Sequence, residues 1–159
     1  MGEVLSEGEL IARVAELRQG GRTVALANGH FDLLHVGHLR YLRAAGEQAD
    51  ALIVAINDDA SVARLKGPGR PLVPAAERAE LLAALAPVDY VVVFSGDSPA
   101  PLLAAVRPDV HCKGTDYTVD TVPERETVRG YGGRIAIVGD PKDHSTRDVI
   151  QSILQKQKR

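Results

Sequence analysis

Residues 28–38 read Asn-Gly-His-Phe-Asp-Leu-Leu-His-Val-Gly-His and directly follow the β-prone run Thr23–Ala27. A second apolar pattern, through Leu39, Leu42 and Ala45, then continues to Gly46 with the spacing of a helix. A strand, a polar loop and a helix in this order are typical of a parallel α/β unit, in which ligands bind outside the carboxyl ends of the strands. The polar loop 28–38 therefore lies where a ligand belongs.

The alternation of strands and helices continues along the chain. Further strands are predicted at 51–56, 90–94, 110–113 and 135–138, and helices at 7–19, after Pro74, after Ser98, at 124–129 and after a capping box at 145–148. The stretch after residue 56, through Arg70, is predicted to be a polar loop. Parallel strands need crossover helices, so the pattern predicts an α/β Rossmann-like three-layer sandwich with a parallel five-stranded sheet. We expect one domain over residues 1–159, with an N-terminal helix within 1–20 and a core over 22–154.

Composition narrows the class of protein. The chain has 159 residues and is 45% hydrophobic, which suits one domain. Its formal net charge of -2 gives no sign of the basic surface that nucleic-acid binding requires. The basic cluster Lys156, Lys158 and Arg159 is short enough to be merely solvated. A single cysteine, Cys112, fits a reducing cytoplasm and is expected to pack in a strand rather than act as a nucleophile. No apolar run approaches the roughly 18 residues of a membrane span. We expect a cytoplasmic protein without nucleic-acid or membrane partners.

Two histidines carry the chemistry of the loop. His35 and His38 are three residues apart at the start of a helix, so their rings share a face beside backbone amides that favour anions. Gly37 between them has no Cβ and would let a polyphosphate approach the backbone. Gly29 would likewise allow the chain to turn after the strand. Neither a dinucleotide-binding fingerprint nor a P-loop follows the strand, which argues against a hydride-transferring enzyme and against a kinase. Paired structural histidines are the plain alternative, and a two-histidine metal site lacks a nearby third ligand. The pattern favours a triphosphate cradle, with no metal ligands predicted.

The pattern Gly-x-Phe-Asp-x-x-His-x-Gly-His over residues 29–38 resembles the cytidylyltransferase-like nucleotidyltransferase superfamily. The resemblance implies that both histidines contact the triphosphate and stabilise the transition state. Further segments look like those of the bacterial heptose-phosphate adenylyltransferases and occur in the same order, at 66–71, 77–78, 88–89, 113–117, 132–134 and 145–146. This likeness spans about residues 22–154. The chain departs from it at His30, where a smaller apolar residue is usual, and at Arg147, where threonine is more frequent.

The resemblance implies transfer of AMP from ATP, with Mg²⁺, to D-glycero-β-D-manno-heptose 1-phosphate, giving ADP-heptose and pyrophosphate. It also implies a homodimer. In some relatives this domain is fused to a sugar kinase; no kinase domain is recognised in this sequence, so we expect the stand-alone form. One rival is a cytidylyltransferase acting on glycerol 3-phosphate, whose Arg-Thr-Glu-Gly-Ile-Ser-Thr segment is replaced here by Asp-Pro-Lys-Asp-His-Ser-Thr at 140–146. A second rival is a non-catalytic nucleotide-binding module. The intact histidine motif and Lys66 argue against it.

The predicted site has three groups of residues. The catalytic group is His35, His38 and Lys66. Lys66 can reach the phosphates from a glycine-rich loop; the alternative is an ordinary solvated lysine. The nucleotide group adds residues at strand ends and a helix start: Asn28, Gly29, Phe31, Gly37, Lys113, Gly114, Ser145 and Thr146. For Ser145 the alternative is plain helix capping. The substrate group contains possible anion clamps and pocket-lining side chains: Asp32, Arg70, Arg78, Asp116 and Tyr117. Asp32 has a structural turn role as its alternative.

Overall fold

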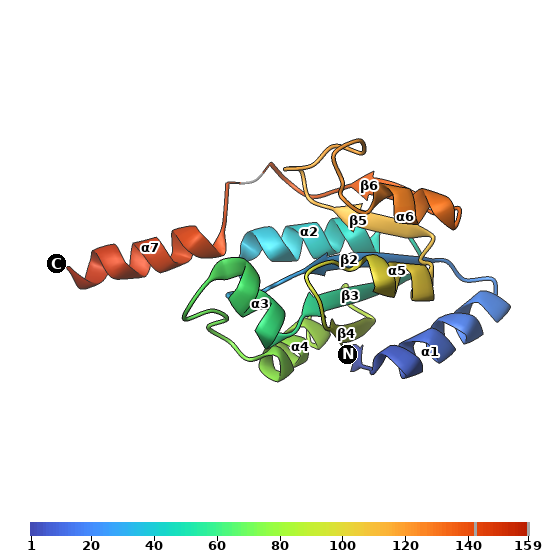
Figure 1. Ribbon diagram of the computed structural model, residues 1–159, viewed down its shortest axis with the longest axis horizontal. Coiled ribbons are helices and arrows are strands. Elements are labelled where there is room, and N and C mark those ends of the chain that lie inside the picture. The colour runs from blue at the N-terminus through green and yellow to red at the C-terminus, as the bar shows by residue number, and fades with distance from the viewer. Residues whose placement is uncertain (142, 159) are drawn as a thin grey trace.

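A computed structural model describes residues 1–141 and 143–158, and its centre is a single parallel sheet (Figure 1). The strand order is β1-β4-β3-β2-β5-β6. The strands are β1 (Glu3–Val4), β2 (Val24–Gly29), β3 (Ala51–Asn57), β4 (Tyr90–Phe94), β5 (Val110–Lys113) and β6 (Arg134–Ile137). Every residue of β3 is buried, as expected for a parallel strand covered on both faces. The Rossmann-like α/β fold predicted from the sequence is confirmed.

Helices cover both faces of this sheet. They are α1 (Glu7–Gln19), α2 (Val36–Gly46), α3 (Asp59–Lys66), α4 (Ala75–Ala83), α5 (Ala100–Val106), α6 (Arg125–Gly130) and α7 (Thr146–Gln157). Apolar side chains of α2 and α4 pack with Leu52, Val54 and Ile56 on one face. Those of α1, α5 and α6 pack with Ile53 and the other alternate residues of the strands on the opposite face. The period-two alternation of β3 thus builds two separate cores.

Two elements differ from the sequence-based expectation. The sheet has six strands rather than five, because Glu3 and Val4 pair with Tyr90 and Val91 at its edge. Two exposed residues contain no alternating pattern from which a strand could be predicted. The stretch predicted as a polar loop contains α3, which Asp58 caps by accepting a hydrogen bond from the Ser61 amide. Lys66 therefore closes a helix instead of lying in a loop.

The topology creates a crevice at one point of the sheet. Strand β2 lies between β3 and β5 in the sheet. In the chain, β3 is the next strand after β2, and β5 comes two strands after β3. The connections after β2 and β5 thus lead away from each other on opposite sides of β2. Such a switch point is where ligands bind in open parallel sheets. The loop 28–38 leaves the sheet at this point.

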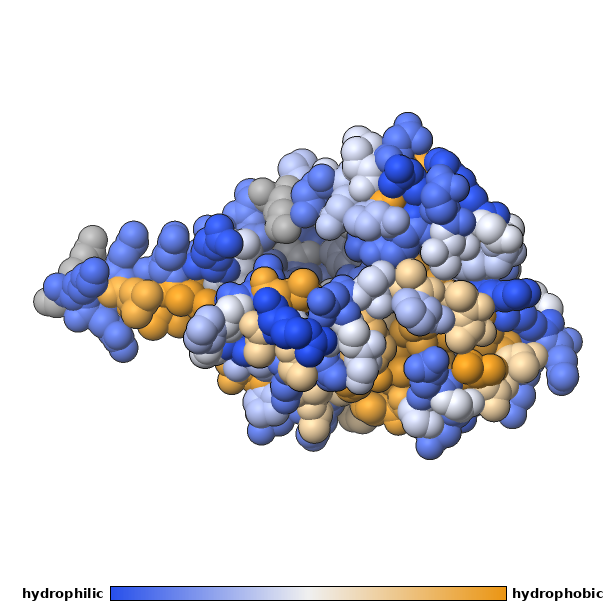
Figure 2. Space-filling model, viewed as in Figure 1, coloured by the Kyte–Doolittle hydropathy of each residue, from blue (hydrophilic) through white to orange (hydrophobic). Residues whose placement is uncertain are grey.

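Helix α7 differs from the other helices in its surroundings. It extends away from the rest of the molecule, and none of its residues is buried (Figure 1). Ile153 and Leu154 are about half exposed, and apolar side chains form a stripe along this helix in Figure 2. Lys156 and Lys158 are exposed, whereas Arg159 and Lys142 lie outside the described residues. Among the helices that the structure describes, none has the length and apolar character needed to cross a membrane.

Candidate active site

A cavity of about 1090 Å³ opens at the carboxyl ends of β2 and β5. Figure 2 shows the corresponding face of the molecule as hollowed. Every residue predicted for the site except Arg78 lines this cavity: Asn28, Gly29, Phe31, Asp32, His35, Gly37, His38, Lys66, Arg70, Lys113, Gly114, Asp116, Tyr117, Ser145 and Thr146. The volume is at the upper end of the range of small-molecule sites, which suits a nucleotide with a second substrate.

The two histidines of the motif form one stacked pair at the start of α2. Their ring centroids are 3.8 Å apart and the rings are inclined by 24°. The backbone N–H of His35 donates to Nδ1 of His38 over 3.3 Å, so a neutral His38 carries its proton on Nε2. A Cβ on Gly37 would lie 3.0 Å from the His35 ring, so glycine at this position also leaves room for that ring. His38 thus presents an N–H donor beside the amides of the first turn of α2.

Phe31 packs against His38 of the pair. It is 4% exposed, and its ring centroid lies 5.1 Å from that of His38. The backbone of Phe31 has a positive φ of 49°, which is uncommon for a non-glycine residue, and its ring turns back toward β2. A Cβ on Gly29 would approach this ring to 2.9 Å. Gly29 is thus required by the packing of Phe31, and the contact of Phe31 with a nucleotide remains a prediction.

Asp32 holds the 70–73 segment beside the motif loop. It is 3% exposed and accepts hydrogen bonds from the amides of Leu72 and Val73 at 2.9 Å. Nε of Arg70 donates to it over 2.7 Å. Burial would raise the pKa of Asp32, but these donors outweigh burial and hold that pKa below its ordinary value. The carboxylate ties the 70–73 segment to the motif and orients Arg70 along the cavity wall.

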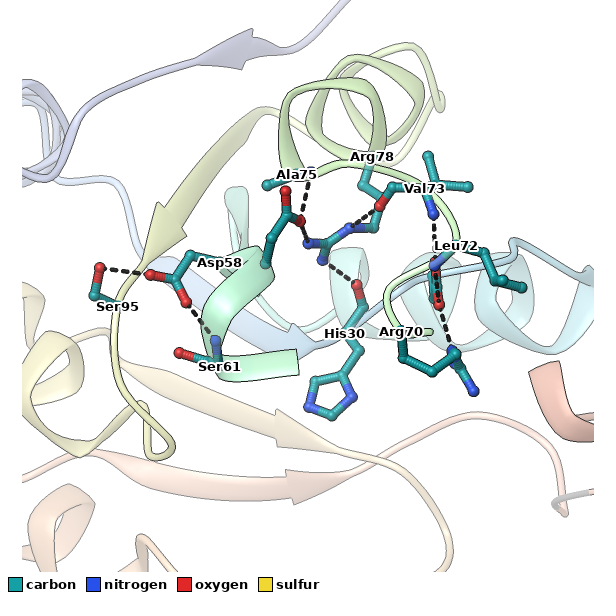
Figure 3. Close-up of polar contacts among 11 residues, drawn as sticks. His30, Asp58, Ser61, Arg70, Leu72, Val73, Ala75, Arg78 and Ser95 are labelled. Carbon is teal, nitrogen blue, oxygen red and sulfur yellow. Dashed lines mark hydrogen bonds and ion pairs between the residues drawn. The ribbon is translucent and has the colours of Figure 1, made fainter. Parts of the chain in front are cut away.

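Arg78 is the predicted substrate residue that does not reach the cavity. Its side chain is fully buried, and its three nitrogens bond to the Val73 carbonyl, the His30 carbonyl and the Asp59 carboxylate at 2.7–2.8 Å (Figure 3). These contacts join α4 to the loop after β2 and to α3. Because its donors are used inside the protein, the structure places Arg78 as a brace beneath the site rather than as an anion clamp.

His30 is hydrogen-bonded directly to Arg78. Its carbonyl is held by Arg78 while its ring extends to the other side and lines the cavity (Figure 3). Burial, together with the charges of Lys66, Arg78 and Arg70, lowers the pKa of His30 to about 4. The imidazole is therefore neutral at physiological pH.

Two other basic side chains line the same wall. Within the described residues, Lys66 has no ion-pair partner, whereas Arg70 is paired with Asp32. Lys66 thus contributes an uncompensated positive charge to this wall.

Lys113 forms the opposite corner of the cavity. At 8% exposure, its Nζ lies 3.4 Å from Oδ1 of Asn28, 3.8 Å from the Glu124 carboxylate and 4.8 Å from the centroid of the Tyr117 ring. Burial lowers the pKa of Lys113, and the charges of Glu124 and Asp116 oppose this shift. A Cβ on Gly114 would lie 3.2 Å from the Asp116 carboxylate, so the glycine lets this loop turn tightly.

The N-terminal end of α7 closes another side. Ser145 caps the helix by accepting from the Asp148 amide at 3.0 Å, as predicted from the capping box. The Thr146 hydroxyl donates to the Leu33 carbonyl at 3.0 Å and so ties α7 to the motif loop. Both residues line the cavity. The capping role of Ser145 is confirmed, and a phosphate contact from this helix start remains a prediction.

Sequence reasoning missed several residues of the cavity. Asn57 is 3% exposed at the end of β3, where the carboxyl-end rule that selected Asn28 could have found it. Glu124, 6% exposed, lies in a polar segment whose sequence gives no sign of burial.

Cys112 is buried in β5, and burial raises the pKa of its thiol to about 12, so it remains a protonated packing residue. Residues 1–141 and 143–158 contain no cluster of three side chains suited to binding a metal ion.

Comparison with known proteins identifies the family of this arrangement. The cytidylyltransferase-like family model matches residues 26–157, which include the histidine motif and the helix α7. The chain belongs to the cytidylyltransferase-like family. The resemblance inferred from the sequence is thereby confirmed.

Individual relatives of this cytidylyltransferase-like chain agree with that assignment. Bifunctional protein HldE from Syntrophotalea carbinolica is 48% identical over 139 residues, covering 87% of this chain and 28% of the relative. The protein of the same name from Alcanivorax borkumensis is 44% identical over 153 residues, covering 96% and 32%. The chain thus spans about a third of the length of these curated relatives.

Solved structures repeat the fold. The lipopolysaccharide core biosynthesis protein from Thermoplasma volcanium has a TM-score of 0.66 at 26% identity, covering 77% of this chain and 100% of that one. Pantothenate synthetase from Thermus thermophilus has a TM-score of 0.65 at 20% identity, covering 99% and 70%. At that identity the second similarity bears on the fold alone.

Proposed function

We propose that this chain transfers AMP from ATP, with Mg²⁺, to D-glycero-β-D-manno-heptose 1-phosphate and releases ADP-heptose and pyrophosphate. The main support is one cavity lined by the stacked His35–His38 pair, Lys66, Lys113 and the start of α7. The order of the heptose-phosphate adenylyltransferase segments along the sequence supports the donor and the acceptor. Similarity to a lipopolysaccharide core biosynthesis protein points the same way.

The acceptor phosphate supplies the nucleophile. Its second pKa is near about 6, so at neutral pH it is largely dianionic and needs no general base. One of its oxygens attacks the α-phosphorus of ATP and forms a new P–O bond. The bond from the α-phosphorus to the bridging oxygen of the β-phosphate breaks, and pyrophosphate leaves with the electron pair. The protein has to align the two phosphates and stabilise the charge that develops.

The cavity offers donors for that charge. His38 can donate from Nε2, because its Nδ1 accepts from the His35 amide. The first-turn amides of α2 and α7 are suited to phosphate oxygens, and Lys66 adds a positive charge without an ion-pair partner among the described residues. Mg²⁺ would be held mainly by the phosphate oxygens of ATP, since the described residues bring no three suitable ligands together. When bound, it would neutralise charge on the leaving pyrophosphate.

Pyrophosphate release tests the proposal against both rivals. ATP and CTP are each offered with heptose 1-phosphate and with glycerol 3-phosphate. The proposal expects fast release only for ATP with heptose 1-phosphate. Release from CTP with glycerol 3-phosphate would favour a cytidylyltransferase. Tight nucleotide binding without release from any pair would favour a non-catalytic module.

We also propose that the protein acts in the cytoplasm as a homodimer. The apolar stripe of α7 supports association, because a stripe of this kind is buried when helices associate; it consists of the partly buried Val149 and Ile150 and the exposed Ile153 and Leu154.

A further inference from the structure

Glu124 is a buried carboxylate in a cavity proposed to bind an anionic nucleotide. It is 6% exposed and lines the cavity immediately before α6. A negative charge here repels phosphates, so its presence calls for a compensating role. Helix capping does not supply that role, because the Glu124 side chain makes no capping hydrogen bond to α6.

The contacts of Glu124 point to Lys113 instead. Its Oε2 lies 3.8 Å from Nζ of Lys113 and 3.4 Å from Nε2 of His111, which is fully buried in the same strand as Lys113. The carboxylate therefore bridges two basic side chains of β5. Burial would raise the pKa of Glu124, but His111 and Lys113 outweigh burial and keep that pKa below its ordinary value. Glu124 is thus ionised at neutral pH.

Lys113 needs such a partner to remain a cation. Besides Glu124, the groups that face it are Asn28 from β2 and Asp116 and Tyr117 from the loop after β5. Burial favours the neutral amine, whereas Glu124 and Asp116 favour the ammonium. Of these, Glu124 is itself buried, so its charge acts through less screening by water.

We propose that Glu124 is a positioning residue that keeps the Lys113 side chain charged and directed toward the nucleotide between Asn28 and Tyr117. This inference rests on the proposed function, because it takes Lys113 as a nucleotide ligand. It adds a residue that acts through Lys113 rather than by touching the substrate. Its removal should therefore change how nucleotide affinity depends on pH.

The test measures the dissociation constant for Mg-ATP by calorimetry between pH 7 and 10.5, with no acceptor present. Affinity should weaken as Lys113 loses its proton. In Glu124→Gln, which removes the charge but keeps the shape, the midpoint should move to lower pH by on the order of one unit or more. Glu124→Asp retains the charge and should keep a midpoint near that of the wild type. Glu126→Gln, which changes a largely exposed side chain on α6, is the matched control and should not shift it.

A double-mutant cycle separates positioning from a general structural effect. Lys113→Met should remove the alkaline transition, and adding Glu124→Gln to it should weaken binding no further. An unchanged midpoint in Glu124→Gln, or additive losses in the double variant, would overturn the inference. A wild-type protein that binds neither ATP nor CTP would contradict the proposed function instead, so the two failures are distinguishable.

Discussion

At the scale of single residues, the amide of His35 sets which nitrogen of His38 carries the proton. That amide donates to Nδ1, so the neutral ring carries its proton on Nε2 and can donate without a second protonation. Phe31 packs against the same ring and limits its rotation. A fixed donor of this kind stabilises charge that develops in the transition state and costs little reorganisation.

Replacing His38 should therefore affect turnover more than folding. We expect His38→Ala to lower kcat by on the order of a hundredfold or more, as for the loss of one transition-state donor. Pyrophosphate release gives kcat, and the thermal midpoint reports the fold. Arg43→Ala, an exposed change on the same helix, is the control and should leave both unchanged. Unchanged turnover in His38→Ala would remove His38 from the mechanism.

His30 gives a pH-dependent prediction for stability. Its pKa is about 4 in the folded protein, against an ordinary value of 6.5. Between these values the unfolded chain binds more protons than the folded one, so this histidine lowers the free energy of unfolding as the pH falls from about 6.5 to 4. His30→Val has no such group. Its thermal midpoint should rise relative to that of the wild type on going from pH 7.5 to 5, and a constant difference would contradict the shifted pKa.

At the scale of elements, α3, α4 and the loop after β2 are held together by one buried arginine. We expect Arg78→Met to lower the free energy of unfolding by about 3 kcal/mol, since it removes the donor from the buried carbonyls of Val73 and His30 and leaves the Asp59 carboxylate with the Ala75 amide alone. Arg64→Met breaks an exposed pair with Asp97 and should cost less than about 1 kcal/mol. Urea unfolding measures both, and equal losses would argue against the brace.

The order of elements was largely predictable from the sequence, because the strands in the centre of the sheet are continuous apolar runs. Edge strand β1 and helix α3 were not. Both are short and mostly exposed, so neither has the apolar period on which such predictions depend. For α3, the cap formed by Asp58 is a weak signal that a glycine- and proline-rich continuation obscures.

The site was predictable to the same extent. Residues at strand ends and helix starts, such as Lys113 and Ser145, were found because their sequence positions place them at the carboxyl edge. Pattern did not reveal that Arg78 lies outside the cavity or that Glu124 lines it, because both are charged residues in polar surroundings whose burial depends on partners distant in sequence. Only three-dimensional packing distinguishes them from solvated side chains.

At the scale of the whole molecule, α7 links the proposed dimer to the site. Its first turn lines the cavity, and Ile153 and Leu154 of its apolar stripe are exposed. We expect Ile153→Asp combined with Leu154→Asp to shift the protein from dimer to monomer, since each change places a charge in the buried stripe of the interface. Sedimentation equilibrium at tens of micromolar measures the mass. Gln151→Asp, on the same helix, is the control, and a wild-type monomer would contradict the proposal.

The product of the reaction that the whole protein is proposed to catalyse is ADP-heptose. Mass spectrometry and ³¹P NMR of a reaction containing Mg-ATP and D-glycero-β-D-manno-heptose 1-phosphate identify that product directly. We expect ADP-heptose and pyrophosphate in equal amounts from the wild type, with His38→Ala forming them on the order of a hundredfold more slowly. Recovery of unchanged heptose 1-phosphate, under conditions in which the protein binds ATP, would contradict the proposed function.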